Sequence, residues 1–132
     1  KFLDLDYQIT TEARMSIAQI FAERGEEGFR DMESGLAQEL GACTGCVIST
    51  GGGIVTRREN YAPLHQNGVI VHLTRDLERL PKTGRPISQS TDLRQLWARR
   101  EPLYRSFADV TADNNGSLEE TLEQIEKELK AL

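Results

Sequence analysis

Two aspartates stand two residues apart near the start of the chain, at the end of a short apolar segment. Asp4 and Asp6 follow the strand-like residues Phe2 and Leu3. In a parallel α/β sheet, ligands gather at the carboxyl ends of the strands. A carboxylate there can hold the water shell of a metal ion or accept a proton from a hydroxyl group. Taken alone, the two aspartates are explained more simply as polar residues that mark the end of a strand.

Three consecutive glycines follow the next strand-like segment, which covers residues 46–50. They are Gly51, Gly52 and Gly53. Glycine tolerates positive φ and lets a ligand approach the backbone N–H groups closely. Because a plain tight turn needs fewer glycines, the run favours a loop that faces a ligand.

Arginine supplies 12 of the 16 basic residues, and its planar guanidinium group suits bidentate binding of carboxylate or phosphate. Arg30 and Glu33 are three residues apart, which places them on one face of a helix. Arg85 lies in a segment rich in Pro, Gly, Ser and Thr (81–90), a predicted loop whose arginine could close over phosphate. Arg100 precedes the sequence Glu-Pro-Leu-Tyr. Each arginine also has a simpler explanation, as a surface pair, a loop residue or a cation near a helix C-terminus.

The two cysteines, Cys43 and Cys46, form one CxxC sequence. A zinc site needs four ligands in most proteins, and His65 and His72 stand apart from the cysteines and from each other. A redox CxxC opens a helix, whereas this one leads into a strand-like segment. The cysteines are therefore interpreted as incidental.

Strand and helix patterns alternate along the chain, which predicts the α/β class with a parallel sheet. Strands are expected at residues 1–4, 46–50, 69–73 and 109–113. One helix is expected to begin with a capping box of Ser16 and Gln19 and to end at Gly25. A second helix is expected to end at Gly41, with an apolar stripe formed by Phe29, Met32, Leu36 and Leu40.

Further helices are expected at 58–66 and at 92–107, the latter with core contacts from Leu93, Leu96, Trp97 and Tyr104. A closing helix is expected after a capping box of Ser117 and Glu120. Its apolar stripe consists of Leu118, Leu122, Ile125, Leu129 and Leu132. No linker or repeat divides the sequence.

The composition is that of one soluble domain, with 132 residues, 28% charged residues and a net charge of −5. An acidic balance with no basic block argues against nucleic-acid binding. No apolar run approaches the roughly 18 residues of a membrane helix, and no secretion signal pattern is present. A cytoplasmic location without membrane partners is expected.

Six short motifs occur in a fixed order: F-x-D-x-D at 2–6, MSI-x-x-IF at 15–21, GE-x-GFR-x-x-E at 25–33, STGGG at 49–53, RP at 85–86 and R-x-PLY at 100–104. In this order and spacing the chain resembles shikimate kinases. The resemblance implies the three-layer P-loop kinase fold, a parallel sheet flanked by helices. It also implies one domain over residues 1–132, with a substrate-binding region at about 5–40 and a lid at about 80–91.

The resemblance implies ATP-dependent phosphorylation of the 3-hydroxyl group of shikimate, on the pathway to chorismate and the aromatic amino acids. By similarity, Arg30 and Arg100 would bind the substrate carboxylate, and Glu33 would orient Arg30. Asp6 would bind the hydroxyl groups and help to deprotonate the reacting one. Backbone N–H groups of Gly51, Gly52 and Gly53 would complete the shikimate pocket.

The nucleotide side of the reaction is implied in the same way. Asp4 would hold Mg²⁺ through water, and Arg85 would be a catalytic lid residue that meets the phosphates of ATP. The partners implied are shikimate and ATP, and the protein is expected to be a monomer.

The sequence departs from the family pattern in three places. The phosphate loop, GxxxxGK followed by Ser or Thr, has no match among the 132 residues. The lid has Ile87 and Ser88 where many relatives have two leucines, and no arginine at 112–115 matches the one that commonly packs on adenine. In this family the first strand is central in the sheet and precedes the phosphate loop. The expectation is therefore that the natural protein carries roughly 30 further N-terminal residues, one strand–loop–helix unit.

Two alternative functions follow from these departures. One is a non-catalytic, shikimate kinase-like protein that binds a ligand, and the other is a related small-molecule kinase such as a gluconate kinase. The paired arginines favour an enzyme, because a protein without activity has no reason to keep both. The glycine run and the GFR sequence favour shikimate as the substrate.

Overall fold

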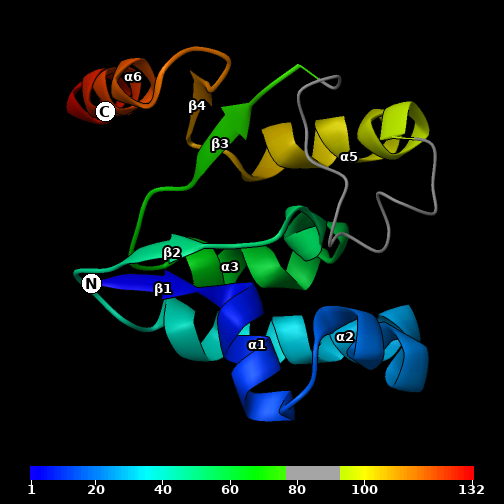
Figure 1. Cartoon of the computed structure of the whole chain (residues 1–132). Coiled ribbons are helices and arrows are strands. Elements are labelled where there is room, and N and C mark those ends of the chain that lie inside the picture. Colours follow the sequence, from blue (N-terminus) through cyan, green and yellow to red (C-terminus); the bar gives the residue numbers. More distant parts are fainter. Residues whose placement is uncertain (77–92) are drawn as a thin grey trace.

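Short parallel strands alternate with helices in this computed structural model, which describes residues 1–76 and 93–132 (Figure 1). The lid expected at about 80–91, Arg85 included, lies outside the described residues. The elements in chain order are β1 (Phe2–Asp4), α1 (Leu5–Ala13), α2 (Ile17–Gly41), β2 (Val47–Ser49), the 3₁₀ turns η1 (Gly52–Thr56) and η2 (Arg58–Asn60), α3 (Tyr61–His65), β3 (Val71–Thr74), α5 (Leu93–Phe107), β4 (Val110–Asp113) and α6 (Leu118–Lys130).

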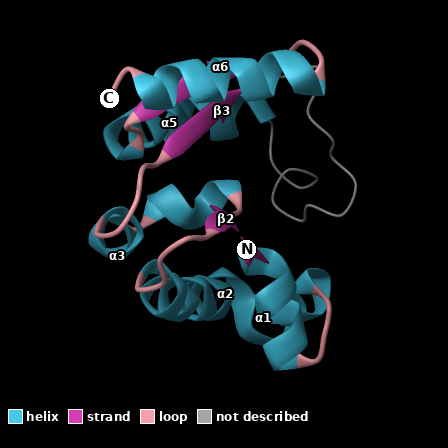
Figure 2. Cartoon of the chain, turned by 90° about the vertical axis from the view of Figure 1, so that its left-hand side faces the viewer, coloured by secondary structure: helices cyan, strands magenta, loops and turns pink. Residues whose placement is uncertain are grey.

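The strands form two parallel pairs, and each lies within two residues of its expected position. Strand β1 pairs with β2, with Leu3 opposite Ile48, and β3 pairs with β4, with Leu73 opposite Ala112. The pairs form separate two-stranded sheets. Figure 2 shows α6 along the β3–β4 pair, and α1 and α2 on the opposite side of β2 from α6. The predicted α/β class with parallel strands is confirmed.

Helix α2, which carries Arg30 and Glu33, begins and bends where the sequence predicts. The Ser16 hydroxyl accepts a hydrogen bond from the Gln19 N–H, and the Gln19 side chain accepts one from the Ser16 N–H. Gly25 has φ 72° and ψ −179°, so it interrupts the helical backbone. This φ favours glycine, and it divides α2 into the two helices that were expected.

Helix α1 follows β1 directly, and the sequence analysis did not predict it. Asp4 caps the N-terminus of the helix, and its carboxylate accepts a hydrogen bond from the Tyr7 N–H. Arg14, with φ 57°, caps the C-terminus. Leu5 and Ile9, on the inner face of the helix, are completely buried. Asp6 therefore lies in the first turn of a helix rather than beyond the end of a strand.

The core lies between β1, α1, α2 and η1, and its side chains meet from segments far apart in sequence. It consists of Leu3, Leu5, Ile9, Ile20, Phe29, Leu36, Ala37, Leu40, Ile54, Val55 and Phe107. The stripe predicted for α2 is confirmed, because Phe29, Leu36 and Leu40 are buried and Met32 packs against them. Burial of Ile54 and Val55 anchors the segment that follows the three glycines.

Two predictions about the later helices are wrong. Of the core contacts predicted for α5, Leu96 is confirmed as buried, but Trp97 is 46% exposed. In α6, the predicted stripe is exposed at Leu118, Leu122 and Leu129, because Thr121 is the buried residue on the face toward β4. Of the helices in residues 1–76 and 93–132, none combines the length and the apolar character needed to cross a membrane.

Candidate active site

The three glycines follow β2: Gly51 precedes η1, and Gly52 and Gly53 are the first two residues of η1. Side chains from three helices converge on this glycine turn (Gly51–Gly53). A Cβ atom on Gly51 would lie 3.3 Å from Asp6 Oδ1 and 3.7 Å from Glu33 Oε2. None of the three has a positive φ. The site therefore uses the small size of these glycines and not their tolerance of positive φ.

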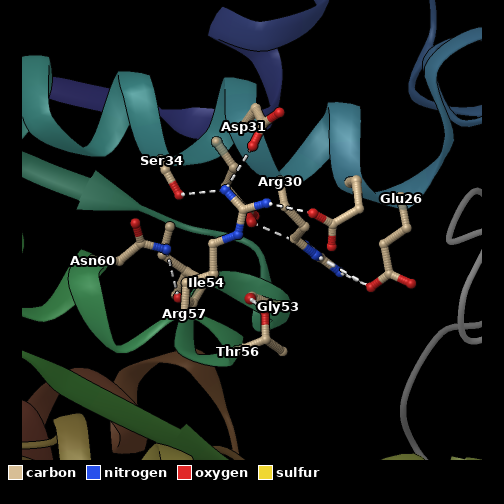
Figure 3. Close-up of polar contacts among 11 residues, drawn as sticks. Glu26, Arg30, Asp31, Ser34, Gly53, Ile54, Thr56, Arg57 and Asn60 are labelled. Carbon is tan, nitrogen blue, oxygen red and sulfur yellow. Dashed lines mark hydrogen bonds and ion pairs between the residues drawn. The ribbon is translucent and has the colours of Figure 1, made fainter.

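Arg30 forms the wall of the site at Gly53, where a Cβ atom would collide with its guanidinium group. Arg30 Nη1 donates to Glu33 Oε1 at 2.9 Å, so the predicted pair on one helix face is confirmed. Both side chains are buried, at 6% and 1% exposure. On its other edge, Arg30 donates from Nε and Nη2 to Glu26 Oε2, at 3.4 Å each (Figure 3).

Glu33 brings a buried carboxylate into the site. Among the described residues, its Oε2 atom has no hydrogen-bond partner although it is buried, and this oxygen is the one that faces Gly51. Burial raises the pKa of Glu33, and the Asp6 carboxylate raises it further, while Arg30 and Arg100 oppose the rise. A polar group left with unmet hydrogen-bonding capacity in such a place is typical of a site that takes a polar ligand.

Arg100 and Tyr104 reach the same turn from α5. They are four residues apart, so they share one helix face. A Cβ atom on Gly52 would lie 2.8 Å from the Tyr104 hydroxyl oxygen and 3.5 Å from Arg100 Nη1. The Tyr104 ring stacks on His72 of β3, with ring centres 4.9 Å apart, and burial lowers the pKa of His72. Gly52 is thus the point where α5 meets the turn.

The structure brings together most of the residues that the sequence singled out. Asp6, Arg30, Glu33 and Arg100 all lie against the run from Gly51 to Gly53. Asp4 lies at the carboxyl end of β1 and caps α1, with its Oδ1 atom 3.1 Å from the Tyr7 nitrogen. The position of Arg85 lies outside the described residues.

A second group of contacts fixes the turn, and the sequence analysis missed it (Figure 3). The Thr56 hydroxyl donates to the Gly53 carbonyl oxygen at 2.7 Å, and the buried Asn60 side chain donates to the Ile54 carbonyl oxygen at 2.9 Å. Arg57 reaches across to α2, where it donates to Asp31 at 2.9 Å and to two further side chains, those of Glu27 and Ser34. The Asp31 carboxylate raises the pKa of Arg57.

Some of the side-chain positions around the glycine turn are indicated by the spacing of residues in the sequence, and others are not. The spacing of Glu26 from Arg30, and of Arg100 from Tyr104, is the four-residue spacing that places two side chains on one helix face. The contacts of Arg57 span 23 to 30 residues, so no local pattern indicates them.

The two cysteines are free thiols. Across residues 1–76 and 93–132, no group of three or more His, Cys, Asp or Glu side chains could hold a metal ion. The described residues therefore show no cluster of metal-binding side chains at the glycine turn.

Comparison with known proteins gives one consistent family. The family model described as shikimate kinase matches residues 1–130. The shikimate kinase of Neisseria meningitidis serogroup C is 36% identical over 138 residues, which cover 98% of this chain and 81% of that protein. The shikimate kinase of Trichormus variabilis is 44% identical over 133 residues, covering 94% and 71%.

A solved structure extends the comparison to three dimensions. The structure of shikimate kinase from Acinetobacter baumannii in complex with shikimate superposes with a TM-score of 0.86 at 32% identity, covering 99% of this chain and 78% of that one. The likeness therefore includes the arrangement of the elements that carry the glycine turn and its neighbours. On the family match and these relatives together, the chain belongs to the shikimate kinase family.

Proposed function

We propose that this protein transfers the terminal phosphoryl group of ATP to the 3-hydroxyl group of shikimate, which yields shikimate 3-phosphate and ADP. Family membership supports the reaction. The observation that carries the proposal for the residues is the convergence of Asp6, Arg30 and Arg100 on one glycine turn. Two guanidinium groups and one carboxylate suit a small ligand that carries one carboxylate and several hydroxyl groups.

Arg30 and Arg100 bind the substrate carboxylate in this proposal. They approach the turn from different helices, α2 and α5, so two independent guanidinium groups meet one anion. Glu33 holds the buried guanidinium group of Arg30 in place through the 2.9 Å contact. Fixing the carboxylate in this way orients the ring of the substrate, and correct orientation is a large part of the rate gain in a reaction between two bound molecules.

Asp6 orients the reacting hydroxyl group and accepts its proton. Its carboxylate lies 3.3 Å from the Cβ position of Gly51, whereas Arg30 lies at the Cβ position of Gly53. The small turn leaves room there for a ligand, whose hydroxyl groups the backbone N–H groups of Gly51, Gly52 and Gly53 can bind. A carboxylate beside the attacking hydroxyl group is the arrangement that phosphoryl-transfer enzymes use to position the nucleophile.

Asp4 and Arg85 serve the nucleotide side. Mg²⁺ is commonly held by one or two carboxylates together with water and substrate phosphates, and Asp4 at the end of β1 fits this pattern as a single carboxylate. The ion would neutralise charge on the phosphates. We assign Arg85 to the lid that meets the phosphates of ATP on the resemblance alone.

The direct test is an activity assay on the full-length protein with ATP, Mg²⁺ and either shikimate or gluconate. Mass spectrometry should find shikimate 3-phosphate, and its formation should fail in Arg100→Ala. A phosphorylated gluconate with unchanged shikimate would favour the gluconate kinase alternative. Binding of shikimate without any phosphorylated product would favour the non-catalytic alternative.

A further inference from the structure

Glu26 lies beside Arg30, and its contact differs from that of Glu33. Glu33 is buried and holds Nη1 at 2.9 Å, whereas the Glu26 side chain is 55% exposed and holds Nε and Nη2 at 3.4 Å each. A single oxygen, Oε2, serves both nitrogens. These distances are longer than the usual range for N–H···O hydrogen bonds, so Glu26 engages this edge of the guanidinium group weakly.

The number of charged groups around the glycine turn suggests a reason for this weak contact between Glu26 and Arg30. Around the glycine turn, the described residues supply two guanidinium groups, Arg30 and Arg100, and three carboxylates, Asp6, Glu26 and Glu33. An anionic substrate adds another carboxylate to this set. Because unpaired negative charge in a half-buried site is costly, displacement of one protein carboxylate would favour binding of the substrate.

Only one of the three carboxylates is free to leave. Glu33 is buried against Arg30, and the Asp6 carboxylate lies against Gly51. Glu26 is the exposed one, and its side chain can turn into solvent without disturbing the core. The other acidic residues on this part of α2 do not compete for Arg30. Glu27 pairs with Arg57 at 3.3 Å, and Asp31 pairs with Arg57 at 2.9 Å (Figure 3).

We infer that Glu26 is a displaceable counter-ion, which occupies the Nε–Nη2 edge of Arg30 and is exchanged for the substrate carboxylate on binding. This inference rests on the proposed carboxylate-binding role of Arg30. It makes Glu26 a residue that tunes specificity. Glu26 lowers the affinity for a ligand that brings its own carboxylate, because that ligand must displace Glu26 from Arg30, whereas a neutral ligand of the same shape leaves Glu26 in place.

The test is the affinity for shikimate, measured by calorimetry on the full-length protein without nucleotide. Glu26→Gln removes the competitor and should lower the Kd about two- to fivefold, the range expected for losing one partly exposed ion pair. Glu27→Gln is the matched control, since it makes the same change in net charge one residue away, at a side chain paired with Arg57. Glu27→Gln should leave the Kd unchanged.

Two further measurements locate the effect at Arg30. The methyl ester of shikimate lacks the negative charge, so Glu26→Gln should not change its affinity. In the background of Arg30→Met, adding Glu26→Gln should bring no gain. Because Arg30→Met leaves Glu33 buried without its partner, Arg30→Lys, which keeps the charge, serves as the second background, where the gain should shrink.

The outcomes separate this inference from the function on which it depends. A higher or unchanged Kd in Glu26→Gln, together with weaker binding in Arg30→Lys, overturns the role of Glu26 and leaves the role of Arg30 intact. Equal gains in Glu26→Gln and Glu27→Gln also overturn it, because the effect would then be one of overall charge. Unchanged binding in both variants of Arg30 overturns the carboxylate clamp and the counter-ion together.

Discussion

Replacing each glycine of the turn by alanine should destabilise the protein in an order set by the space around each Cβ position. Gly51→Ala meets its nearest atom at 3.3 Å, just inside the 3.4 Å of an ordinary contact, while Gly52→Ala meets the Tyr104 hydroxyl oxygen at 2.8 Å. The tyrosine must therefore move by about 0.6 Å. Gly53→Ala requires a larger movement, because its Cβ atom would overlap the guanidinium group of Arg30.

The loss of stability in each variant depends on which group the new Cβ atom must displace. Extra atoms in a packed site cost about 1–3 kcal/mol. Gly53→Ala should reach the upper end of that range, because it displaces a buried guanidinium group held 2.9 Å from Glu33. Gly52→Ala should fall in the middle. Gly51→Ala should cost less than about 1 kcal/mol, since its backbone, with φ −73°, suits alanine.

Urea unfolding of the full-length protein at neutral pH measures this order. Gly35→Ala is the control, because Gly35 lies in α2 with no neighbour near its Cβ position. Alanine should stabilise the helix there by about 0.5–1 kcal/mol. Equal losses in the three turn variants, or the largest loss in Gly51→Ala, would refute the argument that close contact explains the glycines.

Three further predictions concern the polar residues of the site. Arg30→Lys should raise the KM for shikimate about tenfold, because lysine cannot reproduce the guanidinium fork; unchanged steady-state kinetics would remove Arg30 from the clamp. Asp6→Asn should lower kcat by about 10²–10⁴-fold with an unchanged urea midpoint, and near-normal turnover would mean that another group positions the hydroxyl. Because burial raises the pKa of Glu33 in the folded protein, the folded state binds more protons than the unfolded state over the window between the two pKa values. The free energy of unfolding, measured relative to Glu33→Gln, should therefore fall as pH rises from about 4.3 through the raised pKa; a rise over that window would contradict the sign.

Local signals in the sequence predict the part of the fold that carries Arg30. The capping box of Ser16 and Gln19 and the break at Gly25 depend on residues within one or two turns of each other, so the sequence determines them directly. The same holds for the pair of Arg30 and Glu33, since three-residue spacing on a helix brings two side chains together. The orientation of this pair toward the core follows from the apolar stripe of α2.

Helix α1 shows where local reasoning fails. Only Leu5 and Ile9 are buried in it, so its apolar pattern is too sparse to separate a helix from the end of a strand. Its N-terminal signal, Asp4, fits a strand-end carboxylate equally well from the sequence, and the structure shows that the residue also caps the helix. The consequence for the site is that Asp6 is presented by a helix.

The convergence at the glycine turn could be expected only from the family resemblance. The residues that contact Gly51, Gly52 and Gly53 lie about 20 to 50 residues away in the chain, beyond the reach of any periodic pattern. For the same reason the contacts of Arg57 with α2, and the approach of Tyr104 to Gly52, are visible only in three dimensions. Exposure of Trp97 and of the apolar stripe of α6 likewise depends on which helix face meets a neighbour.

One crystal structure of the full-length protein with shikimate bound would test the central claim most directly. The account places the carboxylate of shikimate within hydrogen-bond distance of the guanidinium groups of both Arg30 and Arg100. It places the 3-hydroxyl group beside Asp6, at the run of three glycines. A shikimate molecule bound with its carboxylate away from both arginines would contradict the account.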